Sequence, residues 1–123
     1  MTRGVRIHAD PQYDPTRSNP SDELWFFLYT VTIRNEGTET VQLKSRHWVI
    51  TDENGRVEEV RGPGVVGEQP VLAPGGSFSY TSGCPLGTSV GAMQGTYQMV
   101  TEEGLRFDAE IAPFTLSEPQ TVH

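Results

Sequence analysis

The sequence predicts an all-β domain of about seven antiparallel strands that are folded as a two-sheet sandwich. The β-branched residues Thr, Val and Ile together outnumber Ala and Leu, which favours strands over helices. The 13 glycines and 9 prolines interrupt the chain throughout, and turn sequences separate segments of alternating polarity. A single flat sheet would leave its apolar face in water, so two packed sheets are expected.

The first third of the chain predicts two strands that are joined by a surface loop. Residues 4–10 alternate apolar and polar side chains, which is typical of a half-buried strand, here expected at a sheet edge. Residues 11–23 contain three prolines and predict irregular backbone without a helix. Residues 24–34 carry an unbroken apolar face, which we expect in the core: Trp25, Phe27, Tyr29, Val31 and Ile33.

The middle of the chain predicts two successive hairpins. Residues 35–38 contain Asn and Gly, which tolerate positive φ, so a tight turn is expected to join residues 24–34 to a strand at 40–52. An Asn-Gly pair then predicts a second turn, followed by a short charged strand at 56–61. Glu58 and Glu59 suit an exposed edge; such an edge offers a surface for homodimerisation, which the two adjacent carboxylates oppose.

The remaining strands are expected at 77–82, 92–101 and 105–116. Loops are expected at 62–67, 72–77 and 84–91, and the last two strands should form a hairpin around residues 102–104. No internal repeat is present, so we predict one domain over residues 1–123 with an ordered core at about 4–117.

Charge and cysteine content exclude several classes of partner and compartment. The net charge of −7 disfavours a phosphate backbone, so no nucleic-acid partner is expected. The single cysteine, Cys84, cannot form an intramolecular disulfide. Neither a secretory signal nor an apolar run of bilayer length is present, so we expect a cytoplasmic protein without a membrane partner.

Residues 62–67 match the letters of the dinucleotide fingerprint GxGxxG. That fingerprint requires a helix to begin within it, whereas the prolines and glycines that follow exclude one here. A weaker alternative stays open, in which the amides around Gly62, Gly64 and Gly67 form an anion-binding nest beside Arg61. The other interpretation is a structural loop whose glycines permit positive φ.

The strand at 40–52 contains Arg46 and His47 next to Trp48. The three histidines of the chain lack the spacing of a transition-metal site, and a second cysteine is missing, so no metal and no cofactor are expected. Two interpretations of His47 remain: a strand histidine packed beside Trp48, or a ligand-facing residue that meets an anion together with Arg46.

No catalytic residue is predicted. Cys84 lies in a Ser-Gly-Cys-Pro segment that supplies neither a helix N-terminus nor a neighbouring base, so we expect a structural thiol. Adjacent carboxylates at 52–53, 58–59 and 102–103 lie at turns or on a charged strand, and neighbouring strand positions point to opposite faces. We therefore interpret them as solvated acids.

Four segments carry a resemblance to a known family. They are SRHW at 45–48, GVVGEQP at 64–70, YTSGCPL at 80–86 and GTYQMV at 95–100, and the similarity continues through FDAEIAPFTL. On these segments the chain resembles the bacterial ApaG family. The resemblance implies an immunoglobulin-like or fibronectin type III-like β-sandwich.

The resemblance also implies a function outside catalysis. The ApaG domain recurs as a C-terminal module of certain eukaryotic F-box proteins and in a polymerase-interacting protein, which suggests an adaptor for a protein partner. The family is linked genetically to cobalt resistance and magnesium efflux, its gene lies beside that of a diadenosine-tetraphosphate hydrolase, and it carries no accepted catalytic residues.

Three functional hypotheses follow. The first is a non-enzymatic protein-interaction module that presents the GPGVVGEQP and SGCPLGTSVG segments. The second is a small-anion binder for pyrophosphate or nucleotide polyphosphates, and the third, weaker one is a regulator that binds divalent cations. The candidate ligand- or partner-binding residues are Arg46, His47, Arg61, Gly62, Gly64 and Gly67.

Overall fold

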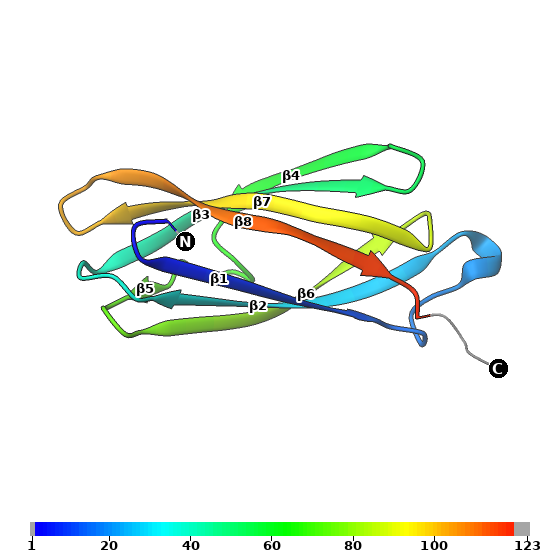
Figure 1. The fold of residues 1–123 in the computed structure, drawn as a ribbon, viewed down its shortest axis with the longest axis horizontal. Helices are drawn as coiled ribbons and strands as arrows, with labels where there is room; N and C mark the ends of the chain where they lie inside the picture. The colour runs from blue at the N-terminus through cyan, green and yellow to red at the C-terminus, as the bar shows by residue number, and fades with distance from the viewer. Residues whose placement is uncertain (1, 120–123) are drawn as a thin grey trace.

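A computed structural model describes residues 2–119, and it confirms an all-β sandwich (Figure 1). Besides one turn of 3-10 helix, η1, the elements in this range are extended strands, and two-residue β5 adds to the seven that were expected. Their bounds are β1 Val5–Tyr13, η1 Pro20–Asp22, β2 Trp25–Asn35, β3 Val41–Asp52, β4 Val57–Pro63, β5 Val71–Leu72, β6 Ser77–Leu86, β7 Val90–Thr101 and β8 Arg106–Ser117.

The strands form two antiparallel sheets. The smaller sheet has the order β1-β2-β6, and the larger sheet has the order β4-β3-β7-β8, with β5 pairing with the start of β3. β1 and β4 are edge strands, as the sequence predicts. β1 also lies against β8 along one side of the sandwich, whereas β4 and β6 form the edges of the two sheets on the opposite side.

The core lies between the sheets, and the face predicted for residues 24–34 is confirmed. Phe27, Tyr29, Val31 and Ile33 are buried, and Trp25 is half-buried against them. Trp48 of β3 meets them from the larger sheet, with its ring centroid 5.4 Å from that of Tyr29. Strict alternation with period two is therefore enough to identify this face.

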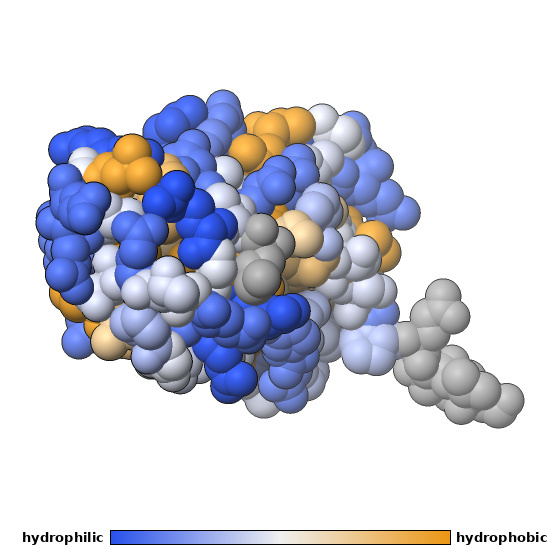
Figure 2. All heavy atoms as spheres, turned by 60° about the vertical axis from the view of Figure 1, so that its left-hand side comes forward, coloured by the Kyte–Doolittle hydropathy of each residue, from blue (hydrophilic) through white to orange (hydrophobic). Residues whose placement is uncertain are grey.

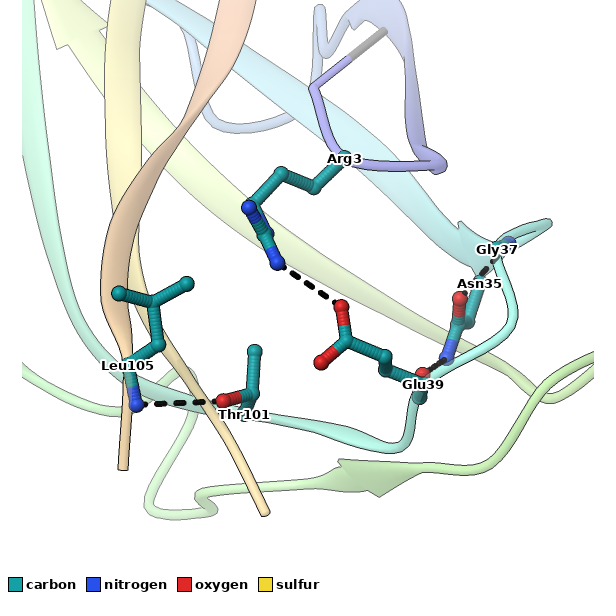
Figure 3. Close-up of polar contacts among 6 residues, drawn as sticks. All are labelled: Arg3, Asn35, Gly37, Glu39, Thr101 and Leu105. Atoms are coloured by element: carbon teal, nitrogen blue, oxygen red, sulfur yellow. Dashed lines mark hydrogen bonds and ion pairs between the residues drawn. The ribbon is translucent and has the colours of Figure 1, made fainter. Parts of the chain in front are cut away.

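The hairpin predicted at residues 35–38 is wrong. β2 belongs to the smaller sheet and β3 to the larger sheet, so the chain crosses between the layers here instead of turning back on itself. At this crossing the side chain of Asn35 is fully buried. Its Nδ2 donates to the carbonyl of Glu39 at 2.7 Å, and its Oδ1 accepts the Gly37 amide at 3.0 Å (Figure 3). Nδ2 also donates to the Leu72 carbonyl at 2.9 Å.

These three hydrogen bonds bind the crossing to both layers. Glu39 leads into β3, and Leu72 belongs to β5, which pairs with the first residues of β3. Arg3 adds an ion pair to Glu39 at 2.8 Å (Figure 3). Asn35 thus combines the local Asx bond to Gly37, which is typical of a turn, with two bonds that hold the crossing to the start of β3 and to β5.

Several other boundaries differ from the predictions because pairing partners extend the strands. β1 continues through Pro11 to Tyr13, which opposes Phe27, although a loop was expected there. β6 continues to Leu86, which opposes Trp25. The turn η1 at Pro20–Asp22 lies where no helix was expected. The hairpins that join β3 to β4 and β7 to β8 are confirmed.

Candidate functional site

A groove on the outer face of the larger sheet collects most of the residues singled out in the sequence. It is a hollow of about 600 Å³ that crosses β4, β3, β7 and β8. We call it the outer groove, and its lining is Ser45, Arg46, His47, Arg61, Gly62, Pro63, Thr96, Gln98 and Asp108. Four of the six candidate residues, Arg46, His47, Arg61 and Gly62, thus lie around one hollow, because the β3–β4 hairpin places His47 opposite Arg61 and Arg46 opposite Gly62.

The floor of the outer groove is a chain of hydrogen-bonded polar side chains. Ser45 Oγ donates to Gln98 Oε1 at 2.8 Å, and Gln98 Nε2 donates to Thr96 Oγ1 at 2.8 Å. Ser45 and Gln98 are opposite each other on β3 and β7, which holds the amide in one orientation. The groove therefore offers oriented donors and acceptors on rigid strands, a requirement for specific recognition.

One wall of the outer groove combines an imidazole, a carboxylate and a guanidinium. His47 Nε2 lies 2.8 Å from Glu59 Oε1, and Arg61 Nη2 lies 3.9 Å from the same oxygen. The His47 side chain is 20% exposed, whereas that of Arg61 is 72% exposed. The imidazole is therefore fixed on the sheet surface, and the guanidinium is the part of this wall that is free to meet a ligand.

Arg46 points toward the other side of the sheet, and Gly62 makes room for it. Arg46 Nη1 donates to the carbonyls of Pro63 and Gly64, both at 3.0 Å. A Cβ at Gly62 would lie 3.0 Å from both terminal nitrogens of this guanidinium. The absence of a side chain at residue 62 thus allows Arg46 to bind the end of β4, so the two residues act together in shaping the groove.

The glycine loop after β4 is held by its own backbone. The Gly64 amide donates to the Lys44 carbonyl at 2.9 Å, and Val65 and Glu68 exchange two backbone hydrogen bonds of 2.8 and 2.9 Å. Gly64 and Gly67 have φ of 59° and 81°. The amide of Gly64 is therefore committed internally, which supports the structural interpretation of the loop over the anion nest.

A second hollow, of about 700 Å³, continues the outer groove toward the start of β8 and shares Ser45, Gln98 and Asp108 with it. It adds Lys44 and Arg106, and neither forms an ion pair with any residue of 2–119. No sequence motif predicts either residue at the site. Lys44 lies at a β-bulge, where the register shifts between Leu43 and Ser45, and Arg106 comes from a strand far along the chain.

A smaller slot of about 210 Å³ lies between the sheets on the side where β4 and β6 are edges. Its lining is Tyr29, Arg46, Trp48, Ile50, Glu58, Val60, Ser82, Gly83, Cys84, Pro85 and Met93. Burial, with a smaller contribution from the Glu58 carboxylate, raises the pKa of the Cys84 thiol to about 11. At neutral pH this group is the protonated thiol, which is a weak nucleophile.

Nearby, the buried hydroxyls of Tyr80 and Tyr97 are hydrogen-bonded to each other. Burial raises the pKa of both phenols, so both stay neutral at physiological pH.

Two further findings concern residues 2–119 as a whole. No three side chains of His, Cys, Asp or Glu in this range converge closely enough to hold a metal ion. The range also contains no helix with the length and hydropathy needed to cross a bilayer.

Comparisons with known proteins agree on one family. The profile of the ApaG domain matches residues 15–101. The chain is 54% identical over 120 residues to the Protein ApaG of Rhodopseudomonas palustris, an alignment that covers 98% of this chain and 92% of that protein. It is 53% identical over 119 residues to the Protein ApaG of Bordetella pertussis, covering 97% and 91%.

A solved structure shows the same architecture. The crystal structure of an ApaA protein from Bordetella pertussis superposes with a TM-score of 0.92 at 52% identity and covers 95% of both chains. The similarity therefore extends beyond the four segments that carry the resemblance, and it includes most of the N-terminal strand and loop.

Proposed function

This chain belongs to the ApaG domain family, and on that premise we propose that it is a non-enzymatic binding module whose outer groove contacts a protein partner. The observation that carries the proposal is that Arg46, His47, Arg61 and Gly62 all border one hollow: His47 and Arg61 form its wall, and Arg46 and Gly62 shape the strands behind it. The sequence singles out the two pairs on separate grounds, residues 46–47 beside Trp48 and residues 61–62 beside the glycine loop. Their grouping on a rigid sheet face is what a recognition surface requires.

The chemistry of the outer groove favours a protein over a single small ligand. The groove and its continuation contain cations, a carboxylate and neutral polar groups together: Arg61, Lys44, Arg106, Asp108, Gln98 and Ser45. Glu59 lies beside Arg61. Mixed charge of this kind suits the polar rim of a protein interface, where it contributes to specificity and association rate. The end of the sandwich seen in Figure 2 shows only small, separate hydrophobic patches among hydrophilic residues.

A second candidate function is the binding of a small anion such as pyrophosphate or a nucleotide polyphosphate. Its support is Arg61, which is highly exposed, together with Lys44 and Arg106 along the continuous hollow. In this version the side chains hold the anion, since the Gly64 amide is bonded to Lys44. Arg61→Ala should then weaken binding in a salt-dependent manner.

We include the family's link to cobalt resistance and magnesium efflux in this proposal and explain it as an indirect effect of partner binding. In this view a binding module in the cytoplasm acts on cation homeostasis through its protein partner. Calorimetry with cobalt and magnesium at modest salt tests whether the chain binds either ion itself. A direct, stoichiometric heat of binding would replace the indirect explanation.

The decisive experiment compares two variants that receive the same new side chain. Gln98→Arg fills the outer groove, and Thr32→Arg places an arginine on the outer face of the smaller sheet, where Thr32 opposes Ser79. An affinity pull-down from native cytoplasm is done with the unmodified protein and both variants. The proposal requires a partner that the Thr32→Arg variant still captures and the Gln98→Arg variant does not. A partner captured by both variants would contradict the proposal that the outer groove is the contact surface.

Small anions are tested in parallel by calorimetry with pyrophosphate, ATP and diadenosine tetraphosphate. If none of the three gives a heat of binding at millimolar concentration, the small-anion function is excluded. If one binds and Arg61→Ala weakens it, the anion function replaces the protein-partner function.

A further inference from the structure

One side of the sandwich is left partly open by the topology. Near the start of β3 the segment 64–70 runs along this side and buries Val65 in the core, and the part beside the slot has no such cover among residues 2–119. The sheet orders place β4 and β6 at the edges on this side, whereas β1 and β8 lie against each other on the opposite side (Figure 1). The slot of about 210 Å³ lies between the two free edges. An extended chain could therefore pair with an edge strand and reach the slot with its side chains.

The two edges differ in their protection against such pairing. β4 carries Glu58, Glu59 and Arg61 within its seven residues, and charges of this kind discourage unwanted pairing. β6 has ten residues, SFSYTSGCPL, and none of them is charged. Among residues 2–119, its backbone hydrogen bonds go to β2 alone. β6 is thus the edge that is suited to strand addition.

The backbone groups that face solvent on β6 can be identified. Phe26 of β2 uses both its backbone groups on the side away from β6: its carbonyl accepts the Asp14 amide at 2.9 Å, and its amide donates to Ser18 Oγ at 2.8 Å. Pro85 of β6 opposes Phe26, so the carbonyl of Pro85 points away from β2. By alternation, the amides and carbonyls of Thr81 and Gly83 also point to the free edge.

The directions of the β6 side chains determine which side chains of an added strand would enter the slot. Ser82 and Cys84 point between the sheets and line the slot, so partner residues opposite them also point inward. The slot has an apolar floor of Tyr29, Trp48 and Met93.

Two charged residues line the slot, and they differ in how their side chains are engaged. Glu58 lines it and forms no ion pair with any residue of 2–119. Arg46, the other charged residue of the lining, is bonded to the carbonyls of Pro63 and Gly64. A long cationic side chain would lay its methylene groups on the apolar floor and bring its charge to Glu58.

We propose that β6 is a docking strand for an extended cationic segment of a partner protein, which pairs with Thr81 and Gly83 and inserts a lysine or arginine into the slot beside Glu58. The net charge of −7 favours a cationic partner as well. Thr30 and Thr81, whose hydroxyls lie 2.8 Å apart on the outer face, offer a polar surface to outward-facing hydroxyl residues. The slot shares only Arg46 with the lining of the outer groove, so the inference goes beyond the proposed function.

The test uses an eight-residue peptide that alternates lysine and threonine, with a glutamate–threonine peptide of the same length as the control. Amide resonances are followed on titration into the labelled protein. Thr81→Pro removes the outward N–H, and Thr81→Val removes the hydroxyl but keeps the N–H. Glu58→Gln removes the carboxylate of the slot, whereas Glu59→Gln removes its neighbour on the opposite face, which contacts His47.

We expect shifts and slowed hydrogen exchange at the Thr81 and Gly83 amides with the lysine peptide only. Thr81→Pro should weaken binding by about tenfold relative to Thr81→Val, which is the scale of one lost backbone hydrogen bond. Glu58→Gln should weaken binding and reduce its salt dependence, and Glu59→Gln should not.

Three results would each overturn the inference: no change at Thr81 and Gly83, equal binding of the glutamate peptide, or equal affinity of the two Glu variants. Glu58→Gln and Glu59→Gln change exposed residues of an edge strand, so both variants are expected to fold. Their difference in peptide affinity therefore tests the inference even if Thr81→Pro does not fold.

Discussion

Replacing Gly64 by alanine should destabilise the fold through two separate effects. The first is conformational: Gly64 has φ of 59°, a left-handed backbone that costs an L-residue about 1 kcal/mol. The second is steric, because a Cβ at this position would lie 2.3 Å from the Glu68 carbonyl oxygen. That oxygen accepts the Val65 amide at 2.8 Å, so any shift that relieves the contact weakens a hydrogen bond of the loop.

Gly67 offers a matched control in the same loop. Its φ of 81° lies in the same region, but a Cβ there would meet no atom within 4 Å. Gly67→Ala should therefore lower the free energy of unfolding by about 1 kcal/mol. Gly64→Ala should lower it by about 2 to 3 kcal/mol, since a lost or strained hydrogen bond adds about another 1 kcal/mol or more.

Urea unfolding followed by tryptophan fluorescence measures both values. Equal destabilisation by the two variants would refute the steric part of the argument, and a Gly64→Ala protein as stable as the parent would refute both parts. The same samples test the anion nest: shifts of the amides at 62–67 on adding pyrophosphate at low salt would show that the loop binds the anion.

Three further predictions concern single side chains. Phe27→Ala removes a ring that is 1% exposed and should cost about 3 to 5 kcal/mol; an unchanged urea midpoint would contradict the burial of this face. Val66 has φ of 42° and is 58% exposed, so Val66→Asn should raise the melting temperature, and a lower one would show that Val66 makes a stabilising contact. The raised pKa of Cys84 predicts slow labelling of the native thiol at pH 7, and Cys84→Ser should keep the partner captured by the outer groove; rapid labelling together with loss of that partner would show a functional thiol.

The parts of the fold that the sequence predicts correctly depend on local periodicity. Trp25 to Ile33 alternate with period two, and β2 runs through the core in that phase. The Asn54-Gly55 turn joins β3 to β4 as expected, since Gly55 has φ of 80° and Asp52 Oδ1 accepts the Asn54 amide at 2.9 Å. In these cases the residues that determine the conformation are neighbours in the chain.

The candidate site could be predicted only in part for the same reason. Arg46, His47, Arg61 and Gly62 come together because one hairpin places them in register, which the turn at 52–56 makes foreseeable. The bond between Ser45 and Gln98 depends on the register of β3 against β7, more than fifty residues along the chain. Neither the bulge at Lys44 nor the position of Arg106 follows from any local pattern.

The error at Asn35 shows how one buried polar side chain determines which surfaces exist. Had residues 35–38 formed a hairpin, β3 would pair with β2, and β6 would not be the edge strand next to β2. Asn35 instead bonds the backbone of Glu39 and Leu72 at the crossing, β3 lies inside the larger sheet, and β2 has β6 as its neighbour. The uncharged strand β6 then becomes an edge that faces the acidic strand β4 across the slot, and the docking surface proposed for β6 is a direct consequence of this crossing.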